Sequence, residues 1–158
     1  MKTFNLRGQP RQVYQPHEQV GPEYQAPTEE RAPHSDILYD SFLRVVRTYA
    51  PPDRDGPEGI RRFTLTDYLP FRVDAWDEED TRVGGPHHGT FHSTFTDGLG
   101  RTVKVVERNV RGSDGDDPAD EYETTYSYNL QDELISCLDA LGNVRYMRYD
   151  GLGRKIFA

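Results

Sequence analysis

Three histidines lie close together in the sequence, at His87, His88 and His92. Imidazole nitrogens are common zinc ligands, and Asp80 or Asp97 lies near enough in sequence to complete a site. The spacing does not match the helical zinc signature, in which two histidines stand four positions apart beside a catalytic glutamate. On a strand, His88 and His92 would share a face but stand about 13 Å apart. We therefore expect a polar loop that leads into a strand, with no metal ion, and keep a metal-dependent hydrolase as the third-ranked function.

The run Asp114-Gly115-Asp116-Asp117-Pro118-Ala119-Asp120-Glu121 is acidic enough to suggest a calcium loop. An EF-hand loop needs glycine at its sixth position and glutamate at its twelfth. Counted from Asp114, these positions hold Ala119 and Thr125, so the pattern fails. We predict a solvated acidic loop.

Nucleophilic catalysis finds no support in the sequence. Cys137 is the only cysteine, and neither Glu133 nor Asp139 supplies the base or the electropositive setting that a reactive thiol needs. No serine lies in a Gly-x-Ser-x-Gly motif. The glycines of 98–100 precede no predicted helix that would bind a phosphate group. We therefore expect a protein that is not an enzyme and needs no cofactor.

The composition narrows the class of protein further. The chain has 158 residues, a net charge of −8 and a mean hydropathy of −0.85. An acidic chain is a poor non-specific partner for nucleic acid or anionic membranes. The sequence holds no apolar run long enough to span a membrane, and its first residues lack the apolar segment of a Sec signal peptide. With 34% hydrophobic residues, the chain has little material for a core of its own.

An internal repeat determines where the structural elements lie. Each copy consists of an aromatic or apolar residue, Asp or Asn, two variable residues, a turn residue and a polar residue that leads into a β-prone run. Three copies are clear and three are looser. The clear copies are 39–46, 96–103 and 149–156, and the looser copies are 4–9, 128–133 and 138–143.

Such a repeat is typical of a β-hairpin. The Asp or Asn side chain accepts a backbone N–H two residues later, and a glycine three residues later supplies the positive φ that the turn needs. We predict that the residues of consequence are turn residues and not catalytic ones. They are Asp40, Asp97, Asp139, Asp150, Gly8, Gly100, Gly142, Gly153, Arg44, Arg101 and Arg154.

The spacing of the last copies predicts a four-stranded antiparallel meander over 122–158. The turn residues Asn129, Asp139 and Asp150 stand 10 and 11 residues apart, which leaves strands of about six residues. A helical stripe of leucine and isoleucine also fits 130–141. Because this run is short and is bracketed by turn residues, we favour strands over a helix.

The whole chain is therefore expected to be all-β, an antiparallel meander of repeat hairpins with long loops. Strand-like runs occupy 37–49, 61–76, 91–96 and 102–110, separated by loops at 50–61 and 77–90. We divide the chain into a first hairpin (1–14), a Pro-rich loop (15–35), a β-strip with inserted loops (36–110), an acidic loop (111–121) and the C-terminal meander (122–158).

The Tyr-Asp-x-x-Gly-Arg frame resembles the YD or RHS repeat. The runs at 63–70, 76–82 and 97–101 are more specific, and are similar to the RHS region of the B-component-like (SpvB-related) proteins of bacterial insecticidal toxin complexes. The resemblance implies a segment of a large hollow β-shell that encloses or delivers a toxic effector. Its partners would be the remainder of that shell or a partner toxin subunit. We expect a truncated or split chain, extracellular as part of a larger toxin assembly and otherwise cytoplasmic.

Arginine outnumbers lysine 16 to 3, and arginines alternate with aromatic residues, as in Arg145-Tyr146-Met147-Arg148-Tyr149. Arginine stacks on aromatic rings and pairs with carboxylates across strands. Exposed aromatic rings with polar neighbours also suit carbohydrate, so a carbohydrate-binding module is the alternative function. Because the repeat spreads these pairs along the strip, we favour cross-strand pairs that stiffen a wall.

Overall fold

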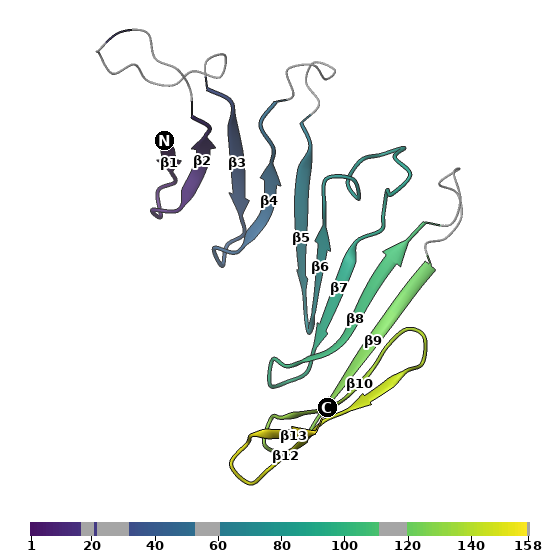
Figure 1. Ribbon diagram of the computed structural model, residues 1–158. Helices are drawn as coiled ribbons and strands as arrows, with labels where there is room; N and C mark the ends of the chain where they lie inside the picture. The colour runs from purple at the N-terminus through teal and green to yellow at the C-terminus, as the bar shows by residue number, and fades with distance from the viewer. Residues whose placement is uncertain (17–20, 22–31, 53–60, 111–119, 158) are drawn as a thin grey trace. The chain divides into compact units, whose positions relative to one another are not determined.

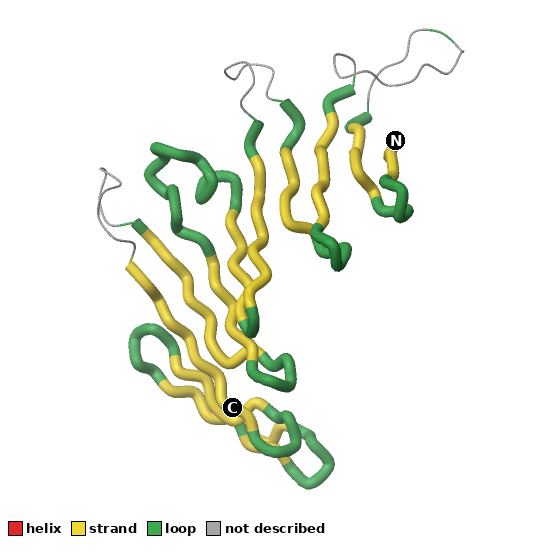
Figure 2. Tube along the Cα trace, turned by 180° about the vertical axis from the view of Figure 1, so that it is seen from behind, coloured by secondary structure: helices red, strands yellow, loops and turns green. Residues whose placement is uncertain are grey.

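The computed structural model describes residues 1–16, 21, 32–52, 61–110 and 120–157. Over these residues every regular element is a β-strand and none is a helix (Figure 2). The all-β prediction is confirmed. The strands are β1 (Lys2–Phe4), β2 (Pro10–Tyr14), β3 (His34–Tyr39), β4 (Val45–Tyr49), β5 (Phe63–Leu69), β6 (Arg72–Trp76), β7 (His92–Thr96), β8 (Thr102–Asn109), β9 (Asp120–Tyr128), β10 (Leu134–Leu138), β11 (Val144–Tyr146), β12 (Arg148–Tyr149) and β13 (Lys155–Phe157).

The strands from β1 to β11 form a meander in which each strand lies beside the next one in the chain. The hydrogen-bonded order runs from β1 to β11, and β12 and β13 form a separate antiparallel pair (Figure 1). Two compact units divide the chain, an N-terminal unit (Met1–Thr66) and a C-terminal unit (Asp67–Ala158), and the division falls within β5. The prediction of an antiparallel meander is confirmed.

The strand register places polar and aromatic side chains on one face of the N-terminal unit. Residues directly opposite each other on neighbouring strands point to the same face of a sheet. His34 pairs with Tyr14, Asp36 pairs with both Gln12 and Tyr49, and Tyr49 pairs with Phe63. A similar face in the C-terminal unit carries Arg72, Asp74, Ser93, Phe95, Lys104, Val106, Arg108 and Glu121.

The helical alternative over 130–141 is wrong, because 134–138 is strand β10 and 139–142 is a turn. Beyond it, the meander predicted for 122–158 is divided at Met147. The Met147 N–H donates to the carbonyl of Ile135 at 2.9 Å, next to an irregularity in the β9–β10 register. The Met147 side chain is buried. The chain therefore leaves the ladder at this residue, and β12 pairs with β13 instead of extending β11.

The run 61–76, predicted as strand throughout, contains a hairpin with no repeat turn. Strands β5 and β6 are joined by Pro70 and Phe71, and Phe71 has a φ of 56°. Proline suits the first of the two central turn positions because its φ is fixed, and in a type II turn the second position requires positive φ. Glycine or Asn usually fills that second position, so Phe71 gave no turn signal in the sequence.

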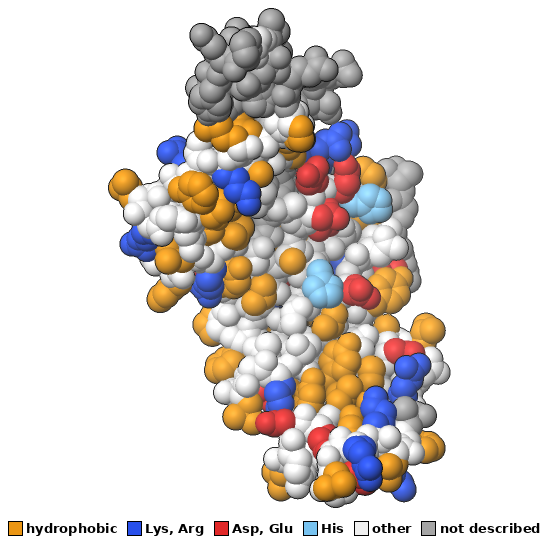
Figure 3. All heavy atoms as spheres, turned by 60° about the vertical axis from the view of Figure 1, so that its left-hand side comes forward, with side chains coloured by type: hydrophobic (Ala, Val, Ile, Leu, Met, Phe, Trp, Pro, Cys, Tyr) orange, Lys and Arg blue, Asp and Glu red, His pale blue; other side chains and the backbone are white. Residues whose placement is uncertain are grey.

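Few apolar side chains are buried in either unit. Among the described residues, the buried hydrophobic ones are Ala32, Val106 and Met147. Many other large hydrophobic side chains remain exposed, including Phe42, Leu99 and Tyr146, and Figure 3 shows hydrophobic side chains at the surface over much of the visible face. The sheets are therefore held mainly by backbone ladders and by side chains that lie along their faces.

In a meander, successive connections lie at alternate ends of the sheet. In the N-terminal unit the turns 5–9 and 40–44 consequently lie at the same end. In the C-terminal unit the connections 70–71, 97–101 and 129–133 share one end, whereas the loop 77–91 lies at the other (Figure 1). This alternation brings turns that are about 30 residues apart in sequence next to each other.

Candidate functional site

Six turns of the described chain share one set of backbone hydrogen bonds. In each, the first residue is Asp or Asn, and its N–H donates to the carbonyl of the fifth residue at 2.8–3.0 Å. The N–H of the fourth residue donates to the carbonyl of the first at 3.0–3.3 Å. The turns are 5–9, 40–44, 97–101, 129–133, 139–143 and 150–154.

The side chain of the first residue completes each turn. Its Oδ1 atom accepts the N–H groups of both the third and the fifth residue, at 2.9–3.0 Å in all six turns. These two amides would otherwise need water. A short side chain that ends in a carbonyl or carboxylate oxygen is well suited to reach both, which explains the Asp or Asn at this position.

In five of the six turns, a side-chain hydrogen bond also joins the fifth residue to the first. The Nε atoms of Arg44, Arg101 and Arg154 donate to Oδ2 of their own aspartates at 2.7 Å. In the turn 139–143 the amide of Asn143 takes this role at 2.9 Å. In the turn 129–133 the direction is reversed, because the Nδ2 of Asn129 donates to Oε2 of Glu133 at 2.7 Å. The first and fifth residues therefore form a complementary pair whose polarity can be exchanged.

The fourth residue of every turn has a left-handed backbone, with φ between 64° and 85°. Glycine occupies this position in four turns, as Gly8, Gly100, Gly142 and Gly153, and Leu43 and Asp132 occupy it in the others. At Gly100 a Cβ atom would meet nothing within 4 Å, so the need for glycine there is conformational and not steric.

Hydrogen bonds within each turn lower the pKa of the aspartate that begins it. The side-chain bond from Arg101 lowers the pKa of Asp97, and the amide of Asn143 lowers the pKa of Asp139. The backbone N–H of Arg154 does the same to the pKa of Asp150. At Asp40 burial acts to raise the pKa, but the hydrogen bonds from Arg44 outweigh it and the pKa is lowered.

Two arginines also reach from one turn to the next turn at the same end. In the N-terminal unit, Nη1 of Arg7 donates to the carbonyl of Ser41 at 3.2 Å. In the C-terminal unit, Nη1 of Arg101 donates to Oδ1 of Asp132 at 2.6 Å. Neighbouring hairpins are therefore joined by side chains at their turns as well as by backbone ladders.

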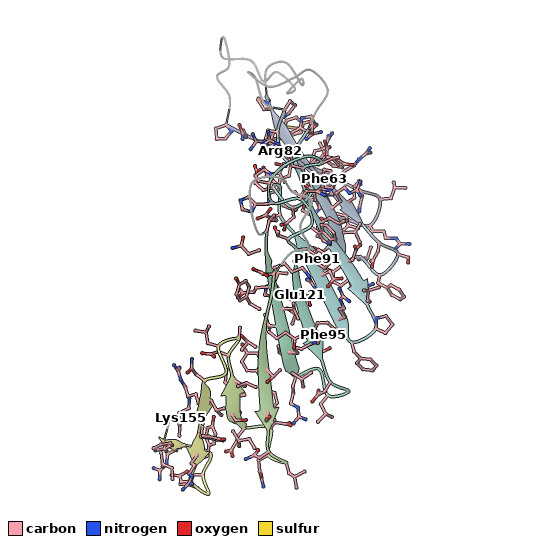
Figure 4. All side chains as sticks on the ribbon, turned by 90° about the vertical axis from the view of Figure 1, so that its right-hand side faces the viewer. Phe63, Arg82, Phe91, Phe95, Glu121 and Lys155 are labelled. Atoms are coloured by element: carbon pink, nitrogen blue, oxygen red, sulfur yellow. The ribbon has the colours of Figure 1, made fainter. Side chains whose placement is uncertain are left out.

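A second set of contacts centres on Arg108, in the C-terminal unit. Its guanidinium lies 4.1 Å from the ring centroid of Phe91, and its Nη1 donates to the Phe91 carbonyl and to Oγ of Ser93 at 2.8 and 2.9 Å. Its Nε donates to Glu121 at 2.9 Å. Phe91 also stacks on Trp76 with ring centroids 4.1 Å apart. Figure 4 shows Phe91 and Glu121 among the side chains of this unit.

Flanking pairs extend this cluster across the same face. Arg72 pairs with the buried Asp74 at 2.7 Å, and Lys104 pairs with Glu123 at 2.9 Å. Arg72 and Lys104 both lie over the ring of Phe95, at 5.3 and 4.7 Å from its centroid. Long cationic side chains that lie flat in this way cover the sheet in place of a second layer, which explains why Ser93 and Val106 beneath them are buried.

The N-terminal unit has a corresponding cluster around Arg61. Arg61 pairs with Asp36 and donates to the carbonyls of His34 and Ala50 at 2.8 and 2.9 Å. The ring of the buried His34 lies against that of Tyr14 in a tilted arrangement, with ring centroids 4.8 Å apart. Burial acts to raise the pKa of Asp36, but the hydrogen bonds from Arg61 and Gln12 outweigh it and hold that pKa below its ordinary value.

The loop 77–91 is organised around Asp80, which is buried. Its carboxylate accepts the Asp77 N–H at 2.8 Å and the Thr90 hydroxyl at 2.5 Å, and its carbonyl accepts the Gly89 N–H at 3.0 Å. Asp77 in turn accepts the Asp80 N–H at 2.9 Å. The two ends of the loop are therefore fastened together, and both oxygens of the Asp80 carboxylate take part.

The three histidines do not converge within this loop. His87 and His88 are exposed in it, whereas His92 lies on β7, where its Nε2 is 3.2 Å from Oγ1 of Thr94. Among the described residues, no group of three or more His, Cys, Asp or Glu side chains is placed to hold a metal ion. Most of the acidic run, at 111–119, and most of the Pro-rich loop lie outside the described residues.

Cys137 is a half-buried free thiol on β10, paired across the sheet with Tyr126 and Arg145. Burial, followed by the proximity of Cys137, raises the pKa of Tyr126.

In the part of the chain that is described, no helix is long and apolar enough to cross a membrane.

Sequence reasoning did not single out Trp76, Phe91, Ser93 or Arg108. Their contacts join residues that are 13 to 17 positions apart in sequence, so they depend on the register between strands. The expectation of arginine–aromatic and arginine–carboxylate pairs across strands described the kind of contact, although not its members.

No protein-family model and no curated protein matches this sequence. Solved structures do match its fold. The crystal structure of TcdB2-TccC3-TEV is 16% identical with a TM-score of 0.72, and that of TcdB2-TccC3 is 16% identical with a TM-score of 0.68. A Tc holotoxin pore of Photorhabdus luminescens is 14% identical with a TM-score of 0.63.

Each match covers 98% of this chain but 9% of the other, so this chain spans about a tenth of the length of those proteins. The likeness therefore concerns one stretch of a much longer polypeptide. The recognition made from the Tyr-Asp-x-x-Gly-Arg frame is confirmed at the level of the fold: the chain folds as an antiparallel β-strip like that stretch of the Tc toxin proteins.

Proposed function

We propose that the chain is a structural, non-catalytic segment of an RHS/YD-repeat toxin shell that encloses or delivers an effector. Its partners are the remainder of that shell or another subunit of the toxin complex. The observation that carries the proposal is a β-strip with six equivalent turns whose described residues bury few apolar side chains. A strip of this kind has open strand edges and uncovered apolar groups, and both favour docking to more of the same structure.

The chemistry of the conspicuous side chains supports the same reading. The carboxylates of Asp40, Asp97 and Asp150 bond to their own turns, and Arg108 bonds to its own sheet. Groups that are occupied with one another in this way hold strands together and are not poised to bind a substrate. If the shell is exported, the chain works outside the cell as part of the larger assembly.

The proposal is tested by the behaviour of the purified 158-residue chain. A wall segment should associate as its concentration rises, or bind a dye that reports exposed apolar surface, because its edges and faces lack their neighbours. Sedimentation velocity over a hundredfold range of concentration measures the first property, and electron microscopy of the associated species looks for curved or closed sheets. A dilute monomer that melts in one sharp cooperative transition and binds no dye would contradict the proposal.

A further inference from the structure

Asp132 occupies a backbone position that suits it poorly. It is the fourth residue of its turn, with a φ of 64°, where four of the six turns have glycine. Aspartate is among the less unfavourable non-glycine residues in the left-handed region, but it is still strained there. Its side chain is 65% exposed, so burial does not account for the choice.

The neighbouring turn supplies a partner for this carboxylate. Arg101 uses Nε and Nη2 to bind Oδ2 of Asp97, each at 2.7 Å, and it uses Nη1 to bind Oδ1 of Asp132 at 2.6 Å. The guanidinium also lies 5.0 Å from the ring centroid of Tyr128, whose hydroxyl donates to the carbonyl of Thr102 at 2.8 Å. One arginine therefore touches its own turn, the last residue of β9 and the turn that follows β9.

The corresponding arginine of another turn shows what this second bond changes. Arg154 binds Asp150 through the same Nε contact of 2.7 Å, and its side chain is 74% exposed. The side chain of Arg101 is 26% exposed. The closing bond within a turn therefore does not by itself order the arginine against the sheet.

The contacts of Arg101 lie just beyond the last backbone pair between β8 and β9. The register between β8 and β9 runs from Asn109 opposite Asp120 to Lys104 opposite Thr125. The side-chain contacts of Arg101 and Tyr128 continue this pairing to the turns. A slip of β9 by one residue would reverse its faces, and it would also separate Arg101 from Asp132.

We propose that Arg101 and Asp132 form a clasp that fixes the hairpin β9–β10 in register beside the hairpin β7–β8. Asp132 stands in the left-handed position because of the clasp and not because of its own turn. The clasp is a property of the strip itself, so it goes beyond a role in a toxin shell and does not depend on that role.

The test is a double-mutant cycle read by amide hydrogen exchange in the full chain. Asp132→Asn keeps the size and the left-handed tolerance of the residue but removes its charge. We expect exchange at residues 102–104 and 126–128 to become about threefold faster, as befits a partly exposed ion pair. In an Arg101→Gln background the same change should have no further effect. An equal effect of Asp132→Asn in both backgrounds would overturn the proposal, and so would an absence of protection in β8 and β9.

Two glycine variants separate the clasp from turn strain. Asp132→Gly supplies the residue that the backbone prefers, so slower exchange in this variant would show that Asp132 serves only its turn and would refute the clasp. We expect faster exchange instead. Gly142→Asp is the matched control, because it places aspartate at a φ of 85° in a turn where its Cβ meets nothing within 4 Å. It should loosen its own turn and leave the exchange of β8 and β9 unchanged, whereas a change there would contradict the proposal.

Discussion

In the turn 97–101, every hydrogen bond that closes the turn joins residues at most four positions apart in the chain, whereas Arg108 binds partners 13 to 17 positions away. The hydrogen bonds of this turn form within five consecutive residues, and the same backbone bonds recur in six turns. The cluster around Arg108 exists only once the strands have paired. Local contacts therefore set where the strands end, and the contacts on the face set how firmly neighbouring strands are held. Predictions that weaken one region and spare the other test this division.

The largest loss is expected on the face. Replacing Arg108 by Met keeps an apolar stem over Phe91 but removes the hydrogen bonds to the Phe91 carbonyl and to Glu121 and the shorter of the two bonds to Ser93. We expect this to cost about 2–4 kcal/mol of unfolding free energy. Urea denaturation measures it. Lys104→Met is the comparison at the flank of the cluster, since the Lys104 side chain is 33% exposed and that of Arg108 is 11% exposed, and it should cost less than about 1 kcal/mol. Equal losses in the two variants would remove the distinction between the centre of the cluster and its flank.

The next effect is expected at the left-handed turn position. Gly100→Val should cost about 1–3 kcal/mol because a β-branched residue is strained at a φ of 80°. Gly98→Val in the same turn is the control, because Gly98 does not have a positive φ and a Cβ there meets nothing within 4 Å. The difference in melting temperature between the two variants measures the strain. Unchanged melting of Gly100→Val would mean that the turn does not limit stability.

The reversed turn 129–133 offers a subtler change. Asn129→Asp should cost about 1 kcal/mol, because the new carboxylate would face Glu133 where an amide now donates. A second change, Glu133→Arg, should restore stability by recreating the Asp–Arg pair of the turn 97–101. Chemical denaturation of the single and double variants checks this. If the double variant is no more stable than Asn129→Asp, the first and fifth residues are not an exchangeable pair.

Acid should act mainly on the turns. The folded pKa values of Asp40, Asp97, Asp139 and Asp150 are lowered, so each carboxylate contributes stability above the unfolded pKa of about 3.9. That contribution is lost as pH falls from about 4 through the lower folded values. A variant with Asn at all four positions should lose this part of the pH dependence. Melting temperatures between pH 7 and pH 2 measure it, and an undiminished acid sensitivity would place the titrating groups elsewhere, with Asp36 as the next candidate.

The smallest effect is expected at the histidines. His87 and His88 are exposed in the loop and His92 lies on β7, so micromolar zinc should release no heat of binding in calorimetry. A variant with alanine at all three positions should then give the same trace as the parent chain. Saturable heat of zinc binding that disappears in the variant would instead show that these histidines bind a metal ion.

The division between local and distant contacts also explains what the sequence could predict. The repeats at 39–46, 96–103 and 149–156 are recognisable because an Asp and an Arg four positions later bond to each other in each of them, and in two of the three a glycine precedes the Arg. The hairpin at Pro70 and Phe71 was missed because its left-handed residue is a phenylalanine. The division of the last meander at Met147 was missed because it rests on a bond to Ile135 on another strand. For the same reason, the members of the Arg108 cluster needed the register before they could be named.

The chain-ordered meander has a consequence for how the protein is made. From β2 to β11 each strand pairs with the strand that precedes it, so the sequence separation between partners is small and folding can advance one hairpin at a time. The early strands of a nascent chain can therefore fold as they leave the ribosome, before the C-terminal strands have been synthesised. During synthesis the most recently paired strand would present an unpaired edge to the strand that follows it. Because the hairpins share one turn design, duplication of the gene segment that encodes a hairpin would lengthen the strip.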